Sequence, residues 1–232
     1  MSDAEYHDID ATDIFVLTKM ELLKFLCKRI LPHGHWGAPK AAPGETPHLV
    51  LTFDDGPFPE TTLPLLELLD EEQVKATFFV MGRRVQKHQE LLQKIAERGH
   101  QIGNHSFSHQ FMPAMSTKKI EYEIESTNQL IKDATGSTPL IFRPPFGLID
   151  HRAARMLQER SMKMVYWGAV SEDWLGIGEP RVVRRTLRRL QHGSMIVLHE
   201  GRTIANQTLG ATRKIIQQAK LQGYTFDKIA VQ

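Results

Sequence analysis

The chain has 232 residues and a mass of 26.5 kDa, a length that suits one domain with a substantial hydrophobic core. Hydrophobic residues make up 41% and charged residues 24%, which excludes collagen-like, low-complexity and wholly disordered proteins. The formal net charge of +2 is too small for a general attraction to nucleic acid. Cys27 is the only cysteine, so an intrachain disulfide framework and a multi-cysteine metal site are also excluded.

The first 47 residues are expected to form an N-terminal extension and linker before a domain at 48–232. Residues 14–31 mix apolar and basic positions as an amphipathic helix does, and their charges rule out a membrane-spanning helix. Residues 32–47 contain four prolines and three glycines, which is typical of a linker. Acidic residues precede this helix where a signal peptide would be positively charged. We therefore expect a cytoplasmic protein, with an extracellular or cell-envelope location as the alternative.

From residue 48 onward, short apolar runs alternate with segments of helical spacing. Strands are predicted at 49–53, 76–81, 140–142, 163–167 and 194–198, with further short strands at 100–103 and 224–226. Helices are predicted at Thr62–Asp70, Gln86–Glu97, Thr117–Ala134, His151–Arg160, Arg181–Gln191 and Gln207–Gln222. This alternation predicts an α/β fold, a distorted barrel of about seven parallel strands with helices outside. An open doubly wound sheet is the alternative.

Two adjacent carboxylates, Asp54 and Asp55, follow the first predicted strand within the segment Thr52–Pro57. Such carboxylates repel each other and lose solvation, and a metal ion on one of them offsets this cost while the other remains free as a base. An acidic turn is the alternative, because Asp-Gly-Pro is an ordinary turn sequence.

Two histidines, His105 and His109, lie four residues apart just after a short predicted strand. On a helical turn this spacing places both imidazoles on one face, and one added carboxylate completes the three-ligand zinc site of hydrolases. Chance is the alternative among eleven histidines. The Asp pair at the end of another strand makes a chance arrangement much less plausible.

With three later segments, these residues resemble the NodB-homology polysaccharide deacetylases of carbohydrate esterase family 4. The resemblance covers roughly residues 48–230 and consists of five motifs in the order of the family, which is far more specific than any one motif. The five segments are Thr52–Pro57, His105–His109, Arg143–Gly147, Ser171–Trp174 and Val197–His199.

The resemblance implies a metal site and an acid–base pair. Asp55, His105 and His109 would hold a divalent metal, zinc in the first place and cobalt or another divalent ion otherwise. Asp54 would be the general base, and His199 the general acid that protonates the departing amine. A metal suits this chemistry because it lowers the pKa of water and polarises a carbonyl group.

The resemblance also implies supporting roles. Arg143 would tether Asp54 and keep it ionised, and Asp173 would orient His199 and raise its pKa. Pairing of Asp173 with Arg143 is the alternative. The substrate pocket would be formed by Pro145, Phe146, Trp174 and Val197, with the backbone N–H of Phe146 directed at the oxyanion.

Three positions depart from the pattern of the family. Phe146 stands where Tyr is usual, Val170 where Asp is usual, and Val197 where Leu is usual. These changes affect the shape of the substrate pocket more than the metal chemistry. Separately, arginines 181, 184, 185 and 188 recur at helical spacing, which predicts a solvated basic helix face, with a contact to an anionic glycan or phosphate as the alternative.

The resemblance implies a metal-dependent hydrolase that removes acetyl groups from N-acetylated sugars. We expect its partner to be an acetylated glycan or oligosaccharide that contains N-acetylglucosamine, and we expect no nucleic acid. The alternatives are an O-acetyl ester esterase of the acetylxylan type, a catalytically inactive carbohydrate-binding homologue, and a hydrolase of non-sugar amides. The sequence carries no indication of the oligomeric state.

Overall fold

The structure is a computed structural model that describes residues 46–231. The predicted helix at 14–31 and nearly all of the linker at 32–47 lie outside the described residues. Within the described part, no helix combines the length and the apolar character needed to cross a membrane.

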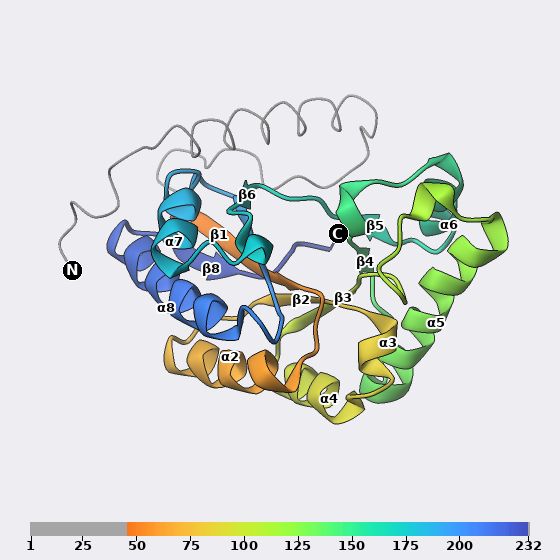
Figure 1. Ribbon diagram of the computed structural model, residues 1–232, viewed down its shortest axis with the longest axis horizontal. Helices are drawn as coiled ribbons and strands as arrows, with labels where there is room; N and C mark the ends of the chain where they lie inside the picture. Colours follow the sequence, from red (N-terminus) through yellow and green to blue (C-terminus); the bar gives the residue numbers. More distant parts are fainter. Residues whose placement is uncertain (1–45, 232) are drawn as a thin grey trace.

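All the strand pairs in the sheet are parallel, and the strands follow the order β5-β4-β3-β2-β1-β7-β6 (Figure 1). An eighth strand, β8, pairs with the first half of β1. The strands are β1 (His48–Asp54), β2 (Thr77–Val80), β3 (Gln101–Asn104), β4 (Ile141–Phe142), β5 (Lys163–Met164), β6 (Ala169–Val170), β7 (Met195–His199) and β8 (Thr225–Asp227). The predicted distorted barrel of about seven parallel strands is therefore confirmed.

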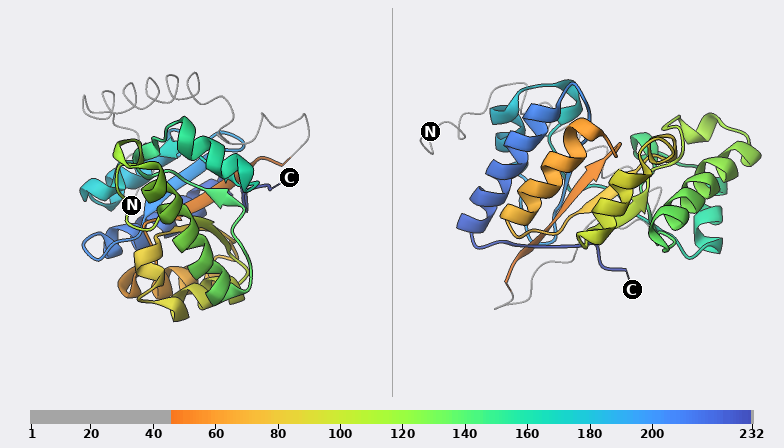
Figure 2. Two further views of the ribbon diagram at one scale, coloured as in Figure 1. Left: turned by 90° about the vertical axis from the view of Figure 1, so that its right-hand side faces the viewer. Right: turned by 90° about the horizontal axis from the view of Figure 1, so that it is seen from below.

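The helices pack around the sheet in nearly the order of the strands that they connect. Contacts run from α7 to α8, α2, α4, α5 and α6 in turn, and Figure 2 shows α8, α2, α4 and α5 side by side. The helices are α2 (Pro59–Glu71), α3 (Gly82–Val85), α4 (Gln89–Glu97), α5 (Thr117–Thr135), α6 (His151–Glu159), α7 (Glu179–Leu187) and α8 (Ala205–Leu221). The 3-10 helices within residues 46–231 are η2 (Met112–Ala114), η3 (Pro145–Gly147) and η4 (Asp173–Leu175).

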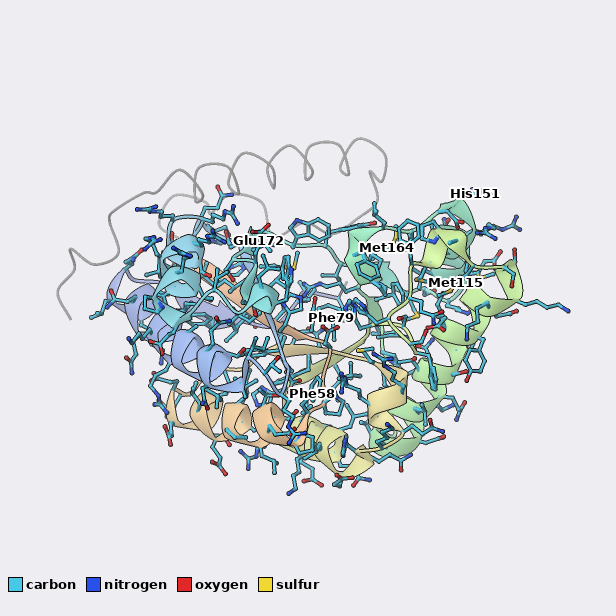
Figure 3. All side chains as sticks on the ribbon, viewed as in Figure 1. Phe58, Phe79, Met115, His151, Met164 and Glu172 are labelled. Atoms are coloured by element: carbon cyan, nitrogen blue, oxygen red, sulfur yellow. The ribbon has the colours of Figure 1, made fainter. Side chains whose placement is uncertain are left out.

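The alternation of side chains along β1 places its last residue inside the barrel. Leu49, Leu51 and Phe53 are fully buried in the apolar cluster between sheet and helices. Val50 belongs instead to a second apolar cluster, inside the barrel, that also contains Phe79. Figure 3 shows Phe79 among the central strands. Because successive side chains of a strand point to opposite faces, Asp54 shares the interior face with Val50.

Two predicted elements are shorter in the structure than expected. The strand expected at 163–167 ends at Met164, and β6 follows only at Ala169. Between these two strands, the carbonyl of Tyr166 accepts a hydrogen bond from the Arg143 guanidinium. The helix expected at 86–97 begins later, as α4 at Gln89, and a separate short helix that was not expected, α3, precedes it at Gly82–Val85.

The predicted basic face of α7 is only partly solvated. Arg181 is exposed, but the side chain of Arg185 is 3% exposed and lies 3.5 Å from the Glu172 carboxylate. The prediction of a solvated face was wrong for Arg185, because the helix packs that position against the segment after β6.

Candidate active site

A cavity of about 450 Å³ lies where the carboxyl ends of the parallel strands meet. This is the end of an α/β barrel at which active sites form. Its lining residues are Asp54, Asp55, His105, His109, Arg143, Pro144, Phe146, Gly147, Trp167, Val170, Glu172, Trp174, Val197 and His199. The chain thus gathers residues from all five motifs in one place.

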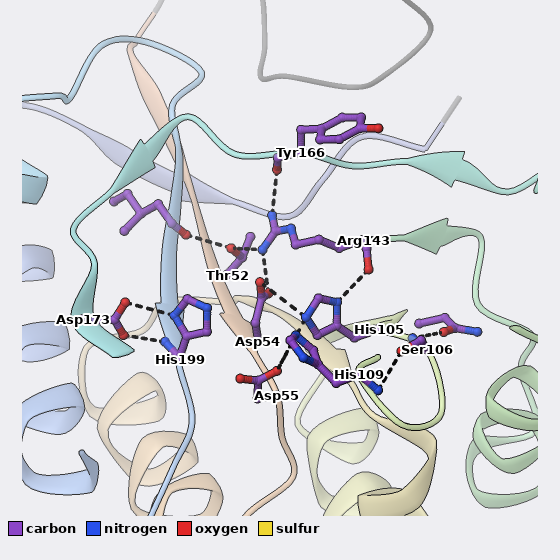
Figure 4. A network of polar contacts seen from close by, with 12 residues as sticks. Thr52, Asp54, Asp55, His105, Ser106, His109, Arg143, Tyr166, Asp173 and His199 are labelled. Carbon is purple, nitrogen blue, oxygen red and sulfur yellow. Dashed lines mark hydrogen bonds and ion pairs between the residues drawn. The ribbon is translucent and has the colours of Figure 1, made fainter. Parts of the chain in front are cut away.

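Asp54 is held by a buried ion pair with Arg143 (Figure 4). Arg143 Nη1 donates to Asp54 Oδ1 at 2.7 Å and to Thr52 Oγ1 at 2.8 Å, while Nη2 donates to the carbonyl of Tyr166 at 3.0 Å. Burial favours the neutral acid, but the charge of Arg143, assisted by that of His199, outweighs burial and holds the pKa of Asp54 below its ordinary value. Asp54 is therefore an ionised carboxylate at neutral pH.

Asp55, His105 and His109 form a compact group of three metal-ligating side chains, all within 4.8 Å of one another through one ligand atom each. Asp55 Oδ1 lies 3.6 Å from His105 Nε2 and 3.4 Å from His109 Nε2. This buried carboxylate oxygen has no hydrogen-bond partner among the residues described. A buried carboxylate oxygen placed in this way between two ring nitrogens fits a cation-binding site.

The tautomer of His105 also fits metal binding. Its Nδ1 lies 2.6 Å from the carbonyl oxygen of Arg143, which only accepts hydrogen bonds, so Nδ1 carries the proton. The lone pair of Nε2 then faces Asp55 and His109. Histidine ligands of metals are commonly oriented by such a bond from the second ring nitrogen.

The two histidines come together on a loop, not on a helical turn. Residues 105–109 contain no helix, and both Ser106 (φ 63°) and His109 (φ 56°) have left-handed backbone. The expectation of a helical turn was therefore wrong, although the rings do lie 5.0 Å apart between centroids. The segment follows directly on β3, and the N–H groups of residues 106–109 bond to side chains rather than to a helical ladder.

His199 and Asp173 form the opposite wall of the site (Figure 4). His199 Nδ1 lies 3.0 Å from Asp173 Oδ1, and the His199 backbone N–H donates to Asp173 Oδ2 at 2.7 Å. Burial disfavours the charged ring, but the Asp173 carboxylate outweighs it and raises the pKa of His199 to about 9. His199 is therefore protonated at neutral pH. The alternative pairing of Asp173 with Arg143 does not occur.

Comparison with known protein families matches residues 41–165 to the family described as polysaccharide deacetylase. The chain is also 33% identical over 205 residues to a peptidoglycan-N-acetylglucosamine deacetylase of Bacillus cereus, covering 87% of this chain and 94% of that protein. The chain belongs to the polysaccharide deacetylase family.

Two further comparisons agree with this assignment. The crystal structure of the Bc1960 peptidoglycan N-acetylglucosamine deacetylase, in complex with an N-hydroxybenzamide, superposes with a TM-score of 0.80 at 29% identity, over 85% of this chain and 91% of that one. A chitooligosaccharide deacetylase of Rhizobium leguminosarum is 30% identical over 77% of this chain and 88% of that protein. The prediction of a metal-dependent deacetylase of N-acetylated sugars is confirmed.

The pocket of this deacetylase has two exposed aromatic walls. Phe146 is 60% exposed, with its ring centroid 4.8 Å from that of His109, and Trp174 is 45% exposed, 5.0 Å from His199. Val197 lines the cavity as expected, whereas Pro145 does not, and its neighbour Pro144 lines it instead.

Besides Pro144, the pocket residues predicted from the sequence omit Gly147, Trp167 and Glu172, which line the cavity. Trp167 is the last residue of a predicted strand. Because active sites of α/β barrels lie at the carboxyl ends of strands, this position could have indicated that Trp167 lines the pocket. Glu172 lies inside the fourth motif, but its side chain is buried against Arg185, which belongs to α7. No local sequence pattern indicates this contact between two elements.

Proposed function

We propose that this deacetylase removes the acetyl group from N-acetylglucosamine units of a glycan or oligosaccharide, with zinc held by Asp55, His105 and His109. The observation that carries the proposal is the unpartnered Asp55 Oδ1 between two imidazole Nε2 atoms, in one cavity with Asp54 and His199. Two histidines and one carboxylate are a donor set that suits zinc and leaves a coordination position open. The B. cereus and R. leguminosarum relatives support the sugar class.

A divalent cation bound here would polarise the acetyl carbonyl and lower the pKa of water. Asp54 is ionised and lines the same cavity, so it accepts the proton of the attacking water. Arg143 holds Asp54 in place from the barrel interior, and the Thr52 hydroxyl in turn accepts a hydrogen bond from Arg143. The oxygen of that water then bonds to the acetyl carbon.

His199 supplies the second proton transfer. Its protonated ring faces the cavity with Nε2, because Nδ1 is engaged by Asp173. It donates a proton to the sugar nitrogen as the carbon–nitrogen bond breaks, which releases acetate and a free amine. We assign the Phe146 backbone N–H to the oxyanion, since Phe146 lines the cavity with left-handed backbone (φ 57°).

The test of the function is acetate release by the purified protein, loaded with zinc or cobalt, from three substrate sets. These are N-acetylchitooligosaccharides, peptidoglycan fragments and O-acetylated xylan. We expect metal-dependent release from the first two that is abolished in His105→Ala. Faster release from acetylxylan would favour the esterase alternative, and bound glycan without any release would favour an inactive carbohydrate-binding protein.

Replacement of Asp54 by Asn separates the base from the metal site. The amide keeps the shape of the side chain but cannot accept the proton, so we expect kcat to fall by about 10²–10⁴. Metal content, measured by elemental analysis, should remain that of the wild type, because Asp54 is not among the three ligands. An unchanged kcat with full metal content would contradict the assigned role.

A further inference from the structure

A fully buried carboxylate, Glu123, lies beneath the loop that carries the two histidines. Its Oε2 accepts the backbone N–H groups of Phe107 at 3.0 Å and Ser108 at 2.7 Å, and its Oε1 accepts the Ser108 hydroxyl at 2.7 Å. Lys119 Nζ, one turn earlier on α5, lies 3.2 Å from Oε1. Burial of a carboxylate is costly unless it is bonded in this way.

The loop depends on side chains for its shape. The N–H groups of Ser106 and His109 also bond to side chains, to Asn104 Oδ1 at 2.7 Å and to Ser106 Oγ at 3.1 Å. With the two N–H groups held by Glu123, every N–H group at positions 106–109 goes to a side chain. Left-handed backbone costs about 1–2 kcal/mol at a residue other than glycine, so a loop with two such residues requires support.

The two histidines are not supported equally. His105 is held by its own bonds, from its backbone N–H to the Val80 carbonyl and from Nδ1 to the Arg143 carbonyl. His109 directly follows the two residues that Glu123 binds, and its backbone N–H bonds only within the loop. Loss of the Glu123 carboxylate should therefore displace His109 more than His105.

We propose that Glu123 is a positioning residue, which holds the loop 105–109 in the conformation that brings His109 to the metal. It touches neither the cavity nor the reacting atoms, and it acts through the backbone of Phe107 and Ser108. The inference rests on the proposed metal site and adds a residue from a different element, α5, to what that site requires.

The experiment measures Co²⁺ affinity of the metal-free full chain by the visible absorption of the bound ion. We expect Glu123→Ala to weaken Co²⁺ binding by about 10- to 100-fold, the range typical of residues that orient metal ligands. Glu123→Gln should remain within a few-fold of the wild type, because the amide oxygen accepts both N–H groups and the amide nitrogen donates to the Ser108 hydroxyl.

Ile131→Ala is the matched control for stability. Ile131 is 1% exposed on the same helix and bonds to no part of the loop, so its truncation weakens the packing of α5 without releasing His109. We expect unchanged Co²⁺ affinity. Equal losses of affinity in Ile131→Ala and Glu123→Ala would overturn the proposal, as would wild-type affinity in Glu123→Ala.

A second measurement tests the route through His109. In the His109→Ala background, Glu123→Ala should reduce Co²⁺ affinity by less than threefold further, because the ligand that it positions is already absent. If Glu123→Ala does not fold, Glu123→Asp is measured in its place, and we expect the same loss of Co²⁺ affinity. The aspartate side chain is one methylene shorter, so its carboxylate does not reach the N–H groups of the loop. If the wild type does not bind Co²⁺, the metal site and this inference are refuted together. If binding is lost in His105→Ala but kept in Glu123→Ala, the metal site stands and this inference alone is refuted.

Discussion

Asp54 and His199 occupy paired positions on neighbouring strands and have opposite proton requirements. The register of β1 and β7 aligns the two residues. The pKa of Asp54 is lowered by the Arg143 charge against the effect of burial, and that of His199 is raised to about 9 by Asp173. At neutral pH one is therefore ready to accept a proton and the other to donate one, which predicts a bell-shaped pH profile with a wide plateau.

Asp173→Asn should move the basic limb of the pH profile of kcat/KM. The amide keeps a hydrogen bond to His199 but removes the charge that raises its pKa, so His199 loses its proton at lower pH. We expect a shift of about one to two pH units downward, measured as acetate release between pH 5 and 10. Asp150→Asn, at the start of α6, is the control and should leave the limb in place. A basic limb that does not move would contradict the proposed acid.

At the scale of elements, α5 shows how local signals define a helix that serves the site. Ser116 accepts the N–H of Lys119 with its side chain, which caps the first turn. Gly136 ends the helix with left-handed backbone (φ 74°), which glycine adopts without strain. Between these caps, apolar residues face the barrel, and Glu123 lies on the side that meets the histidine loop.

Ser116→Ala should lower the free energy of unfolding by about 1 kcal/mol, because one N–H group of the first turn loses its partner. Ser116→Asp, which keeps an acceptor at the same place, should retain most of the stability. Urea denaturation measures both. Co²⁺ affinity should change little, since Glu123 lies beyond the first turn, and an affinity loss as large as that of Glu123→Ala would contradict the separation of the two roles.

The stability of the whole molecule should depend on His100. Its Nδ1 accepts the backbone N–H of Ala76 at 3.1 Å, which requires an unprotonated nitrogen, and its ring packs on Phe78. Burial, assisted by the charge of Lys75, lowers the pKa of His100 to about 4. The unfolded chain, with an ordinary histidine pKa, thus binds more protons than the folded one between pH 6.5 and 4.

We therefore expect the protein to lose stability as the pH falls from about 6.5 to 4, by at most about 1.4 kcal/mol per pH unit from this residue. The measurement is urea denaturation of the metal-free protein across that range. His109 also has a lowered pKa and contributes with the same sign, so the difference between wild type and His100→Gln isolates His100. A difference that stays constant with pH would show that His100 does not titrate with folding.

The apolar run at 49–53 determined by itself that Asp54 ends a buried strand, because a short apolar run followed by turn residues is a local signal. The order of the motifs likewise placed Asp55, His105 and His109 at strand ends, and parallel strands bring their carboxyl ends to one edge. The parallel arrangement of strands and the edge that carries the site were thus contained in the sequence, whereas the choice between a barrel and an open sheet was not.

Only the tertiary structure decided which charges meet. Arg143 is 89 residues from Asp54, and Asp173 is 26 residues from His199, so no local pattern distinguishes these pairs from the exchanged ones. The same holds for the loop at 105–109, whose left-handed residues are supported by Glu123 from a different element. Local periodicity reports which face of an element is buried, but a partner across the fold is selected only when the chain has packed.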